Sequence, residues 1–178
     1  MKKILFTLTL SLFTIISFAQ APTFTLSEEK PTFPNQYVVI EVNELTIDDS
    51  YKKIIDWINI TYDDPSQIIK AQLEHKYIRI QSESKDITHS NTLMRYLIQF
   101  RFEEKIVIID IVELDIYTVT SSKSLKFGDT GNWSSISLKN KKMYKKNGKF
   151  KKAYSSNALK IMSYFNELVL SIDTHIKQ

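Results

Sequence analysis

The sequence contains no cysteine, and only 3 glycines and 4 prolines occur in its 178 residues. Without cysteine the protein has no disulfide, no thiolate ligand for a metal, no thiol nucleophile and no site for thioether lipid attachment. The scarcity of glycine also excludes a glycine-rich phosphate-binding loop. Stability must therefore come from the packing of hydrophobic side chains, which make up 43% of the residues.

Histidines are also few, and none is spaced for metal binding or catalysis. His75, His89 and His175 form no H-x-x-x-H or H-E-x-x-H pattern. They fall in a predicted hairpin turn, a polar connection and the end of a predicted helix, where side chains are usually solvated. The G-x-S-x-G pattern of serine hydrolases is absent as well. We expect no metal and no cofactor.

The first residues have the pattern of a secretory signal peptide. Basic residues precede an apolar stretch from Ile4 to Ile16, and small residues surround Ala19. The stretch is shorter than the roughly 20 residues that a spanning helix needs, so we expect cleavage after Ala19. Residues 1–19 are the predicted signal peptide. The mature protein is expected to be soluble, periplasmic or secreted, and not lipid-anchored.

The mature chain is nearly balanced in charge. Loss of Lys2 and Lys3 lowers the number of basic residues from 24 to 22, against 20 acidic residues. A nucleic-acid-binding domain usually has a strong basic excess, so we expect no nucleic acid partner.

Residues 20–36 have the composition of a linker, with Pro22, Pro31 and Pro34 between polar residues. We expect ordered structure to begin near Tyr37. Residues 37–178 are long enough for one hydrophobic core and are predicted to form a single domain.

Strand periodicity, in which apolar side chains recur at every second position, occurs in residues 37–42, 69–74, 78–81, 95–102 and 106–117. The phase of the last segment shifts at Ile111-Val112, which predicts a β-bulge. Residues 118–135 are rich in small and polar residues and are predicted to form a loop.

Helical periodicity occurs in two segments. The first follows Asp48, Asp49 and Ser50, which suit an N-cap and first turn, and ends at Asp63-Asp64-Pro65. The second follows a cap at residues 155–157 and has the clearest apolar stripe: Leu159, Ile161, Met162, Phe165, Leu168, Val169 and Ile172. The order β-α-β-β-β-β-α predicts an α+β fold, an antiparallel sheet of about five strands with two helices on one face.

Three segments of the chain, taken in order, carry a resemblance to a known family. They are the strand Tyr37–Val42, the helix Ser50–Pro65 continuing into Ile68–Ala71, and the hairpin Tyr96–Ile111. Their most distinctive part is the aromatic-rich helix end from Trp57 to Pro65. Over roughly residues 37–117, the chain resembles an exported bacterial family of unknown function described as having a TBP-like fold. The resemblance implies that fold and no activity or site residues.

One cluster of carboxylates suits acid–base chemistry or a hard cation. Strand alternation puts Glu113 and Asp115 on one face, and Asp110 joins them if the bulge lies at Ile111-Val112. No histidine, arginine or metal-loop glycine is near them in the predicted arrangement. The interpretation that we favour is a strand end entering solvent.

A lysine-rich segment runs from Lys139 to Lys152, with Tyr144, Phe150 and Tyr154 among or beside the lysines. Such a run suits diffuse attraction to an anionic polymer or lipid surface, at about 1 kcal/mol for each cation. The alternative is a solvated loop. The predicted contacts for an anionic ligand are Lys139, Lys141, Lys142, Lys145, Lys146, Lys149, Lys151 and Lys152.

The leading functional hypothesis is a non-enzymatic binding or interaction domain of the cell envelope, with the open sheet face or the lysine-rich segment as its contact surface. The alternatives are a hydrolase using Asp110, Glu113 and Asp115, an anionic polymer or lipid binder, and a structural module of an envelope assembly. The expected partners are an envelope protein, an anionic glycan or a lipid surface. The open face is predicted to mix opposite charges, which argues against DNA: Lys70, Arg79, Arg95 and Arg101 with Glu41, Glu74 and Glu83.

The signal peptide gives a direct prediction. Mass spectrometry of the exported protein should show a chain that begins at Gln20, or at pyroglutamate formed from it. Full-length protein recovered from the cytosol would contradict the predicted cleavage.

Overall fold

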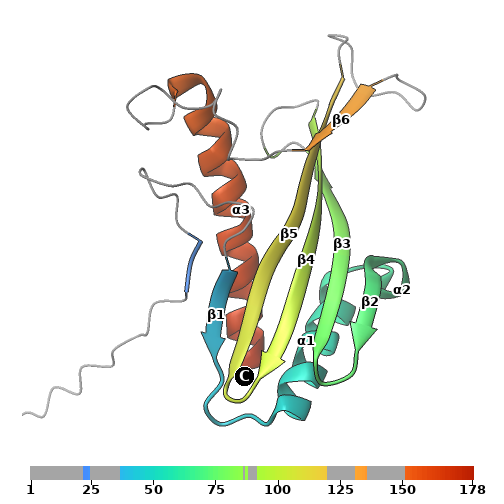
Figure 1. The fold of residues 1–178 in the computed structure, drawn as a ribbon, viewed down its shortest axis with the longest axis vertical. Helices are drawn as coiled ribbons and strands as arrows, with labels where there is room; N and C mark the ends of the chain where they lie inside the picture. The colour runs from blue at the N-terminus through green and yellow to red at the C-terminus, as the bar shows by residue number, and fades with distance from the viewer. Residues whose placement is uncertain (1–21, 25–36, 86, 88–91, 120–130, 136–150) are drawn as a thin grey trace, which may run out of the picture.

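The computed structural model describes residues 22–24, 37–85, 87, 92–119, 131–135 and 151–178. The predicted signal peptide lies outside these residues. The elements are β1 (Tyr37–Glu41), α1 (Ile47–Thr61), α2 (Pro65–Ile68), β2 (Ile69–Leu73), β3 (Tyr77–Lys85), β4 (Thr92–Glu103), β5 (Ile106–Val119), β6 (Gly131–Ser135) and α3 (Lys152–Ile176), as Figure 1 shows.

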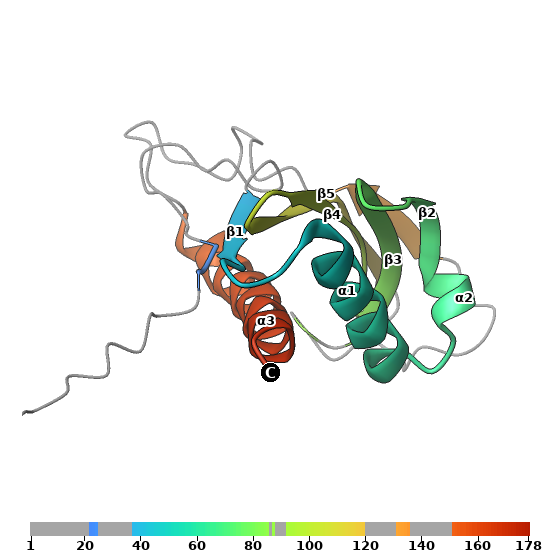
Figure 2. The same ribbon diagram turned by 90° about the horizontal axis from the view of Figure 1, so that it is seen from below.

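The strands form one antiparallel sheet in the order β1-β5-β4-β3-β2, and β6 pairs with the end of β5. Figure 2 shows α1 and α3 on the same face of this sheet. The predicted α+β class and antiparallel sheet are confirmed. No helix in the described ranges is both long and apolar enough to cross a membrane.

The prediction that residues 118–135 form a loop is wrong at both ends of this range. β5 continues to Val119, and β6 pairs with it in a register that aligns Tyr117 with Trp133. The sequence of β6, GNWSS, has little strand propensity of its own. Its strand conformation depends on the hydrogen-bonding edge that the long β5 offers.

The predicted β-bulge is confirmed. Ile98 pairs with Ile111 and Leu97 pairs with Glu113, so Val112 is the extra residue on β5. The bulge shifts the alternation of side chains by one position. It therefore lets both halves of β5 place apolar side chains on the face that the helices cover.

Both long helices begin earlier than predicted. The N-cap of α1 is Thr46, whose Oγ1 accepts a hydrogen bond from the amide of Asp49 at 3.1 Å. Ser50, predicted as part of the cap, is buried within the helix. The N-cap of α3 is Lys151, which makes no side-chain cap bond. α3 therefore begins without a side-chain cap.

A further short helix, α2, follows α1. The predicted stop at Asp63-Asp64-Pro65 ends α1, but Asp64 then acts as the N-cap of α2 and Pro65 occupies its first turn. Proline is favourable there because the first helical amides have no partner within the helix.

The core lies between the sheet and the two long helices. Ile54 and Ile58 of α1 and Phe165 of α3 are fully buried. They contact the inward-facing side chains of the sheet, which include Val38, Ile40, Ile98, Phe100 and Ile109. These are predicted core residues, whereas Leu168, predicted as part of the same core, is only partly buried against it. Leu159, predicted as part of the apolar stripe, is instead 61% exposed because it lies on the outer side of α3.

Phe24 extends the core beyond the predicted start of ordered structure. Its side chain is only 4% exposed, and its ring meets that of Phe165 edge-on at 6.4 Å. The side chain of Asn166 accepts a hydrogen bond from the Phe24 amide at 2.8 Å and donates one to its carbonyl at 3.2 Å. Part of the predicted linker thus packs against α3.

Truncation of Phe165 tests the core. Phe165→Ala should lower the free energy of unfolding by about 3–5 kcal/mol, because it removes a fully buried ring. The exposed Leu170→Ala is the control on the same helix and should change it little. Denaturant melts measure both, and a loss below about 1 kcal/mol for Phe165→Ala would show that α3 is peripheral.

Candidate functional site

Most of the lysine-rich segment lies outside the described residues. Lys151 is exposed, and Lys152 is the first residue of α3. Binding of an anionic ligand by this segment stays a prediction. Of the histidines, His75 is exposed and contacts Asp48 at 2.9 Å, His175 is near the end of α3, and His89 is not described.

The three carboxylates of β5 do share the open face of the sheet, as the bulge predicts. The prediction that no arginine lies near them, however, was wrong. Arg101 Nε donates to Asp110 Oδ2 at 2.8 Å, and Arg95 Nη2 donates to Asp115 Oδ2 at 2.8 Å. Both arginines come from the neighbouring β4, so only the strand register reveals them.

These ion pairs give the carboxylates a structural role. The hydrogen bond from Arg101 to Asp110 raises the pKa of the guanidinium. Within the described residues, no group of three histidine, aspartate or glutamate side chains is placed to hold a metal ion. Asp110 and Asp115 thus join β4 to β5, while Glu113 is exposed to solvent.

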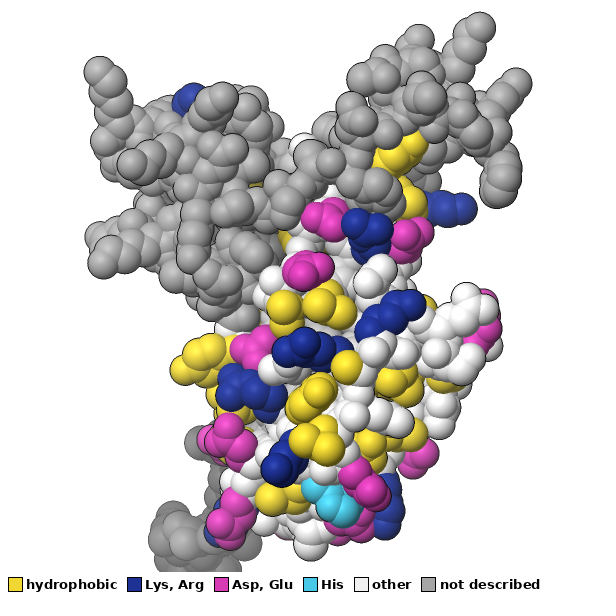
Figure 3. Space-filling view, turned by 45° about the vertical axis from the view of Figure 1, so that its right-hand side comes forward, with side chains coloured by type: hydrophobic (Ala, Val, Ile, Leu, Met, Phe, Trp, Pro, Cys, Tyr) yellow, Lys and Arg dark blue, Asp and Glu magenta, His cyan; other side chains and the backbone are white. Residues whose placement is uncertain are grey.

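The rest of the open face has the same mixed character. Arg79 Nε donates to Gln99 Oε1 at 2.6 Å, and its guanidinium lies 5.5 Å from the centre of the Tyr77 ring. Figure 3 shows acidic, basic and apolar side chains interspersed, without a patch of one kind. Such a surface does not select a ligand of one charge.

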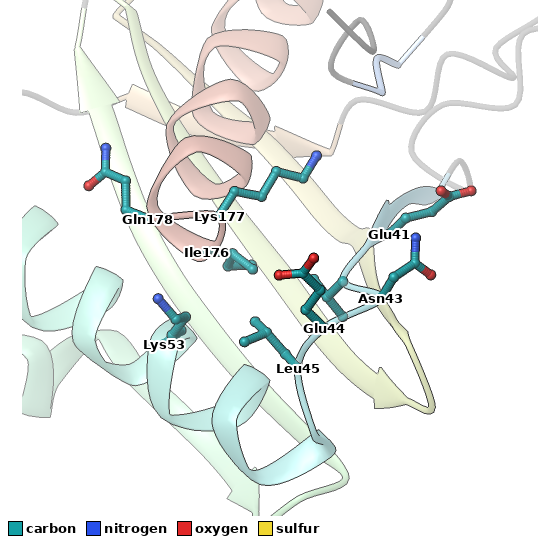
Figure 4. A pocket seen from close by; sticks show the side chains of 9 residues that line it. Glu41, Asn43, Glu44, Leu45, Lys53, Ile176, Lys177 and Gln178 are labelled. Atoms are coloured by element: carbon teal, nitrogen blue, oxygen red, sulfur yellow. The ribbon is translucent and has the colours of Figure 1, made fainter.

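The structure contains a cavity of about 360 Å³ where the segment after β1 meets the end of α3 (Figure 4). Glu41 and Glu44 balance Lys53 and Lys177 on its lining, and Lys177 also pairs with Asp173. Because opposite charges cancel and the lysines and glutamates have long, mobile side chains, the cavity offers no fixed recognition group.

A second cavity, of about 330 Å³, has a better defined chemistry. We call it the tyrosine pocket. It lies where the end of α1, the middle of β3 and β4, and one side of α3 come together. Its lining consists of Trp57, Thr61, Tyr62, Ser82, Glu83, Tyr96, Tyr164, Glu167, Leu168 and Ser171.

Three tyrosine hydroxyls form a hydrogen-bonded chain along the pocket. The hydroxyl of Tyr96 lies 3.3 Å from that of Tyr62 and 2.7 Å from that of Tyr164. Tyr96 projects from the buried face of β4, Tyr62 follows α1, and Tyr164 lies on α3. Each ring is thereby fixed by a different element, and the chain of hydroxyls needs no rearrangement to meet a ligand.

Edge-on and tilted ring contacts hold these groups in place. Tyr96 meets Phe165 edge-on at 5.4 Å and Tyr164 in a tilted arrangement at 5.7 Å, measured between ring centres. Trp57 meets the ring of Tyr62 at 5.9 Å, and its Nε1 donates to Ser171 Oγ at 3.1 Å. The walls of the pocket are therefore rigid, because aromatic pairs of this geometry are favourable.

Burial keeps the three tyrosines protonated. It raises the pKa of Tyr62 to about 12, although the hydrogen bond with Tyr96 opposes the shift. Burial also raises the pKa of Tyr96 and of Tyr164, with the neighbouring tyrosines adding to the effect. At neutral pH the hydroxyls consequently act as hydrogen-bond donors and acceptors and not as bases.

The sequence analysis did not predict this pocket as a site. Trp57 and Tyr62 belong to the aromatic-rich helix end that carried the family resemblance. The contacts of Tyr96 and Tyr164 were missed because they join distant parts of the chain. Tyr96 lies 34 residues after Tyr62, and Tyr164 lies 68 residues after Tyr96. One available signal was Tyr96 itself, an apolar-face strand position with a hydroxyl that needs a buried partner.

Comparisons with known proteins bear on the fold. The crystal structure of a DUF4468 family protein from Bacteroides ovatus ATCC 8483 superposes with a TM-score of 0.63 at 11% sequence identity, over 86% of this chain and 92% of that chain. No model of a known family and no curated protein sequence matches. The likeness shows a shared fold with an uncharacterised protein, and the TBP-like description stays a prediction.

The tyrosine cluster makes stability sensitive to alkali. An unfolded tyrosine has a pKa near 10, so above about pH 10 the unfolded chain ionises while Tyr62 stays protonated. Stability should be fully present below pH 10 and fall as pH rises toward about 12. Urea melts of the wild type and of Tyr62→Phe at a series of pH values measure this fall in stability.

The Tyr62→Phe variant should show the smaller decline with pH. Tyr37→Phe removes an exposed hydroxyl and is the matched control, expected to decline as the wild type does. Equal declines for wild type and Tyr62→Phe would contradict a buried, protonated hydroxyl.

Proposed function

We propose that the chain is an exported, non-enzymatic binding domain of the cell envelope and that the tyrosine pocket is its ligand site. The observation that carries the proposal is the chain of three linked tyrosine hydroxyls beside an open cavity of about 330 Å³. This volume lies at the lower end of the range for small-molecule sites.

The arrangement of the pocket favours binding over a purely structural role. A structural aromatic cluster gains most by closing its cavities, since empty space forfeits packing energy. Here, Trp57 and Tyr96 are buried, yet a cavity remains beside the indole of Trp57 and the hydroxyl of Tyr96. Apolar walls with a few fixed polar groups are the usual composition of a ligand site.

The protonation state of the pocket suits recognition by hydrogen bonding. Tyrosines with raised pKa values remain neutral, so they offer a ligand hydroxyl donors and acceptors and do not remove its protons. On β5, arginines already engage two of the carboxylates considered for a hydrolase. The N-terminal sequence pattern is the support for export to the envelope.

Chemical-shift mapping tests the proposal. Isotope-labelled mature protein is titrated with envelope glycans, lipid headgroups and small amines and polyols. A ligand should shift the Trp57 indole N–H and amides of the residues that line the pocket. Ser171→Phe, which places a ring at the pocket, should lower affinity about tenfold or more.

Thr174→Phe introduces the same ring on α3 at an exposed position outside the pocket lining, and is the control. It should bind as the wild type does. Shifts confined to other surfaces, or equal binding by Ser171→Phe and wild type, would show that the pocket is not the ligand site.

A further inference from the structure

The charge that faces the tyrosine pocket is negative and comes from Glu167, an exposed residue of α3. Glu83 also borders the pocket, but strand alternation turns its side chain to the open face of the sheet, where its partner in the register is Arg95. The remaining side chains are hydroxyls, aromatic rings and one leucine. The field at the entrance is therefore negative, in contrast to the balanced cavity near Lys53.

The pocket also has more hydrogen-bond acceptors than donors. Two of the three tyrosine protons are used within the chain of hydroxyls, which leaves more lone pairs than protons for a ligand. The indole N–H of Trp57 already donates its hydrogen bond to Ser171 Oγ. The Glu167 carboxylate accepts one long bond of 3.3 Å from Ser163 and keeps other lone pairs. A complementary ligand has to bring N–H or O–H donors.

Aromatic walls favour a cation further. The faces of tryptophan and tyrosine rings carry negative electrostatic potential and attract ammonium and guanidinium groups. An anion would meet the Glu167 carboxylate and the oxygen lone pairs without a basic side chain of the lining to balance them. A neutral polyol would satisfy the acceptors but would gain nothing from the charges.

We propose that the tyrosine pocket binds a primary ammonium group on a short carbon chain. The proposal rests on the proposed binding function and names its ligand class. The ammonium would donate to the tyrosine oxygens and lie within the field of Glu167. The cavity of about 330 Å³ accommodates a free diamine or a single lysine side chain, and not a bulky polymer segment.

Three probes with the same four-methylene spacer separate charge from size. They are 1,4-diaminobutane, 1,4-butanediol and adipate, titrated into the mature protein while Trp57 indole and pocket amides are followed by NMR. The diamine should bind about tenfold more tightly than the diol, and adipate should not bind. Raising the salt concentration should weaken the binding of the diamine and leave the binding of the diol unchanged.

Charge-neutral variants locate the effect. Glu167→Gln should weaken diamine binding about two- to fivefold and leave diol binding unchanged, whereas Glu83→Gln, on the open face of the sheet, should change neither. Glu104→Gln is the control, because Glu104 is an exposed glutamate in the turn between β4 and β5. These exposed substitutions should not change the melting temperature, so a loss of affinity is not a loss of folding.

Two further probes distinguish the sources of the ammonium group. Nα-acetyl-lysine amide represents a protein side chain, and its Nε-acetylated form has the same chain without the charge. Tighter binding of the lysine compound than of diaminobutane would assign the site to peptides, and the reverse order to free amines.

The outcomes separate the two proposals. Diol or adipate that binds in the pocket as tightly as the diamine would overturn the ammonium inference and leave the binding function standing. Diamine binding that Glu167→Gln does not weaken would also overturn it. If no probe or panel compound shifts the pocket residues, the proposed function itself fails.

Discussion

Phe165 joins three parts of the molecule that are distant in the chain. Its fully buried ring on α3 contacts Tyr96 of β4, Tyr164 of its own helix and Phe24 near the N-terminus. The interaction fixes how deeply α3 lies against the sheet. That depth decides whether the hydroxyl of Tyr164 reaches Tyr96, and so whether the tyrosine pocket exists.

The hydroxyl of Tyr96 imposes the second constraint. A buried hydroxyl without a partner costs about 1–3 kcal/mol, so β4 can carry a tyrosine at this position only if other polar groups converge on it. Tyr62 and Tyr164 meet that need from two helical regions. The same convergence prevents close apolar packing at this point, which leaves space beside the hydroxyls. The cavity and the hydrogen bonds thus have a common origin.

The fold was predictable from local patterns where these patterns dominate. Val38, Ile40 and Phe100 alternate along their strands, and the phase shift at Ile111-Val112 located the bulge. β6 was missed because its conformation depends on β5. The ion pair between Arg101 and Asp110 and the contact between Tyr96 and Tyr164 were missed because a single sequence contains no register between strands or between a strand and a helix.

The anchoring of Phe24 by Asn166 joins residues that are 142 positions apart. A contact of such high sequence separation cannot form until α3 has emerged, and closing so long a loop is slow. Until then, the inner face of β1, β4 and β5 is uncovered. Between the completion of β5 and the emergence of α3, the growing chain therefore presents an apolar sheet face that α3 does not yet cover, and this interval is when it is most prone to aggregate.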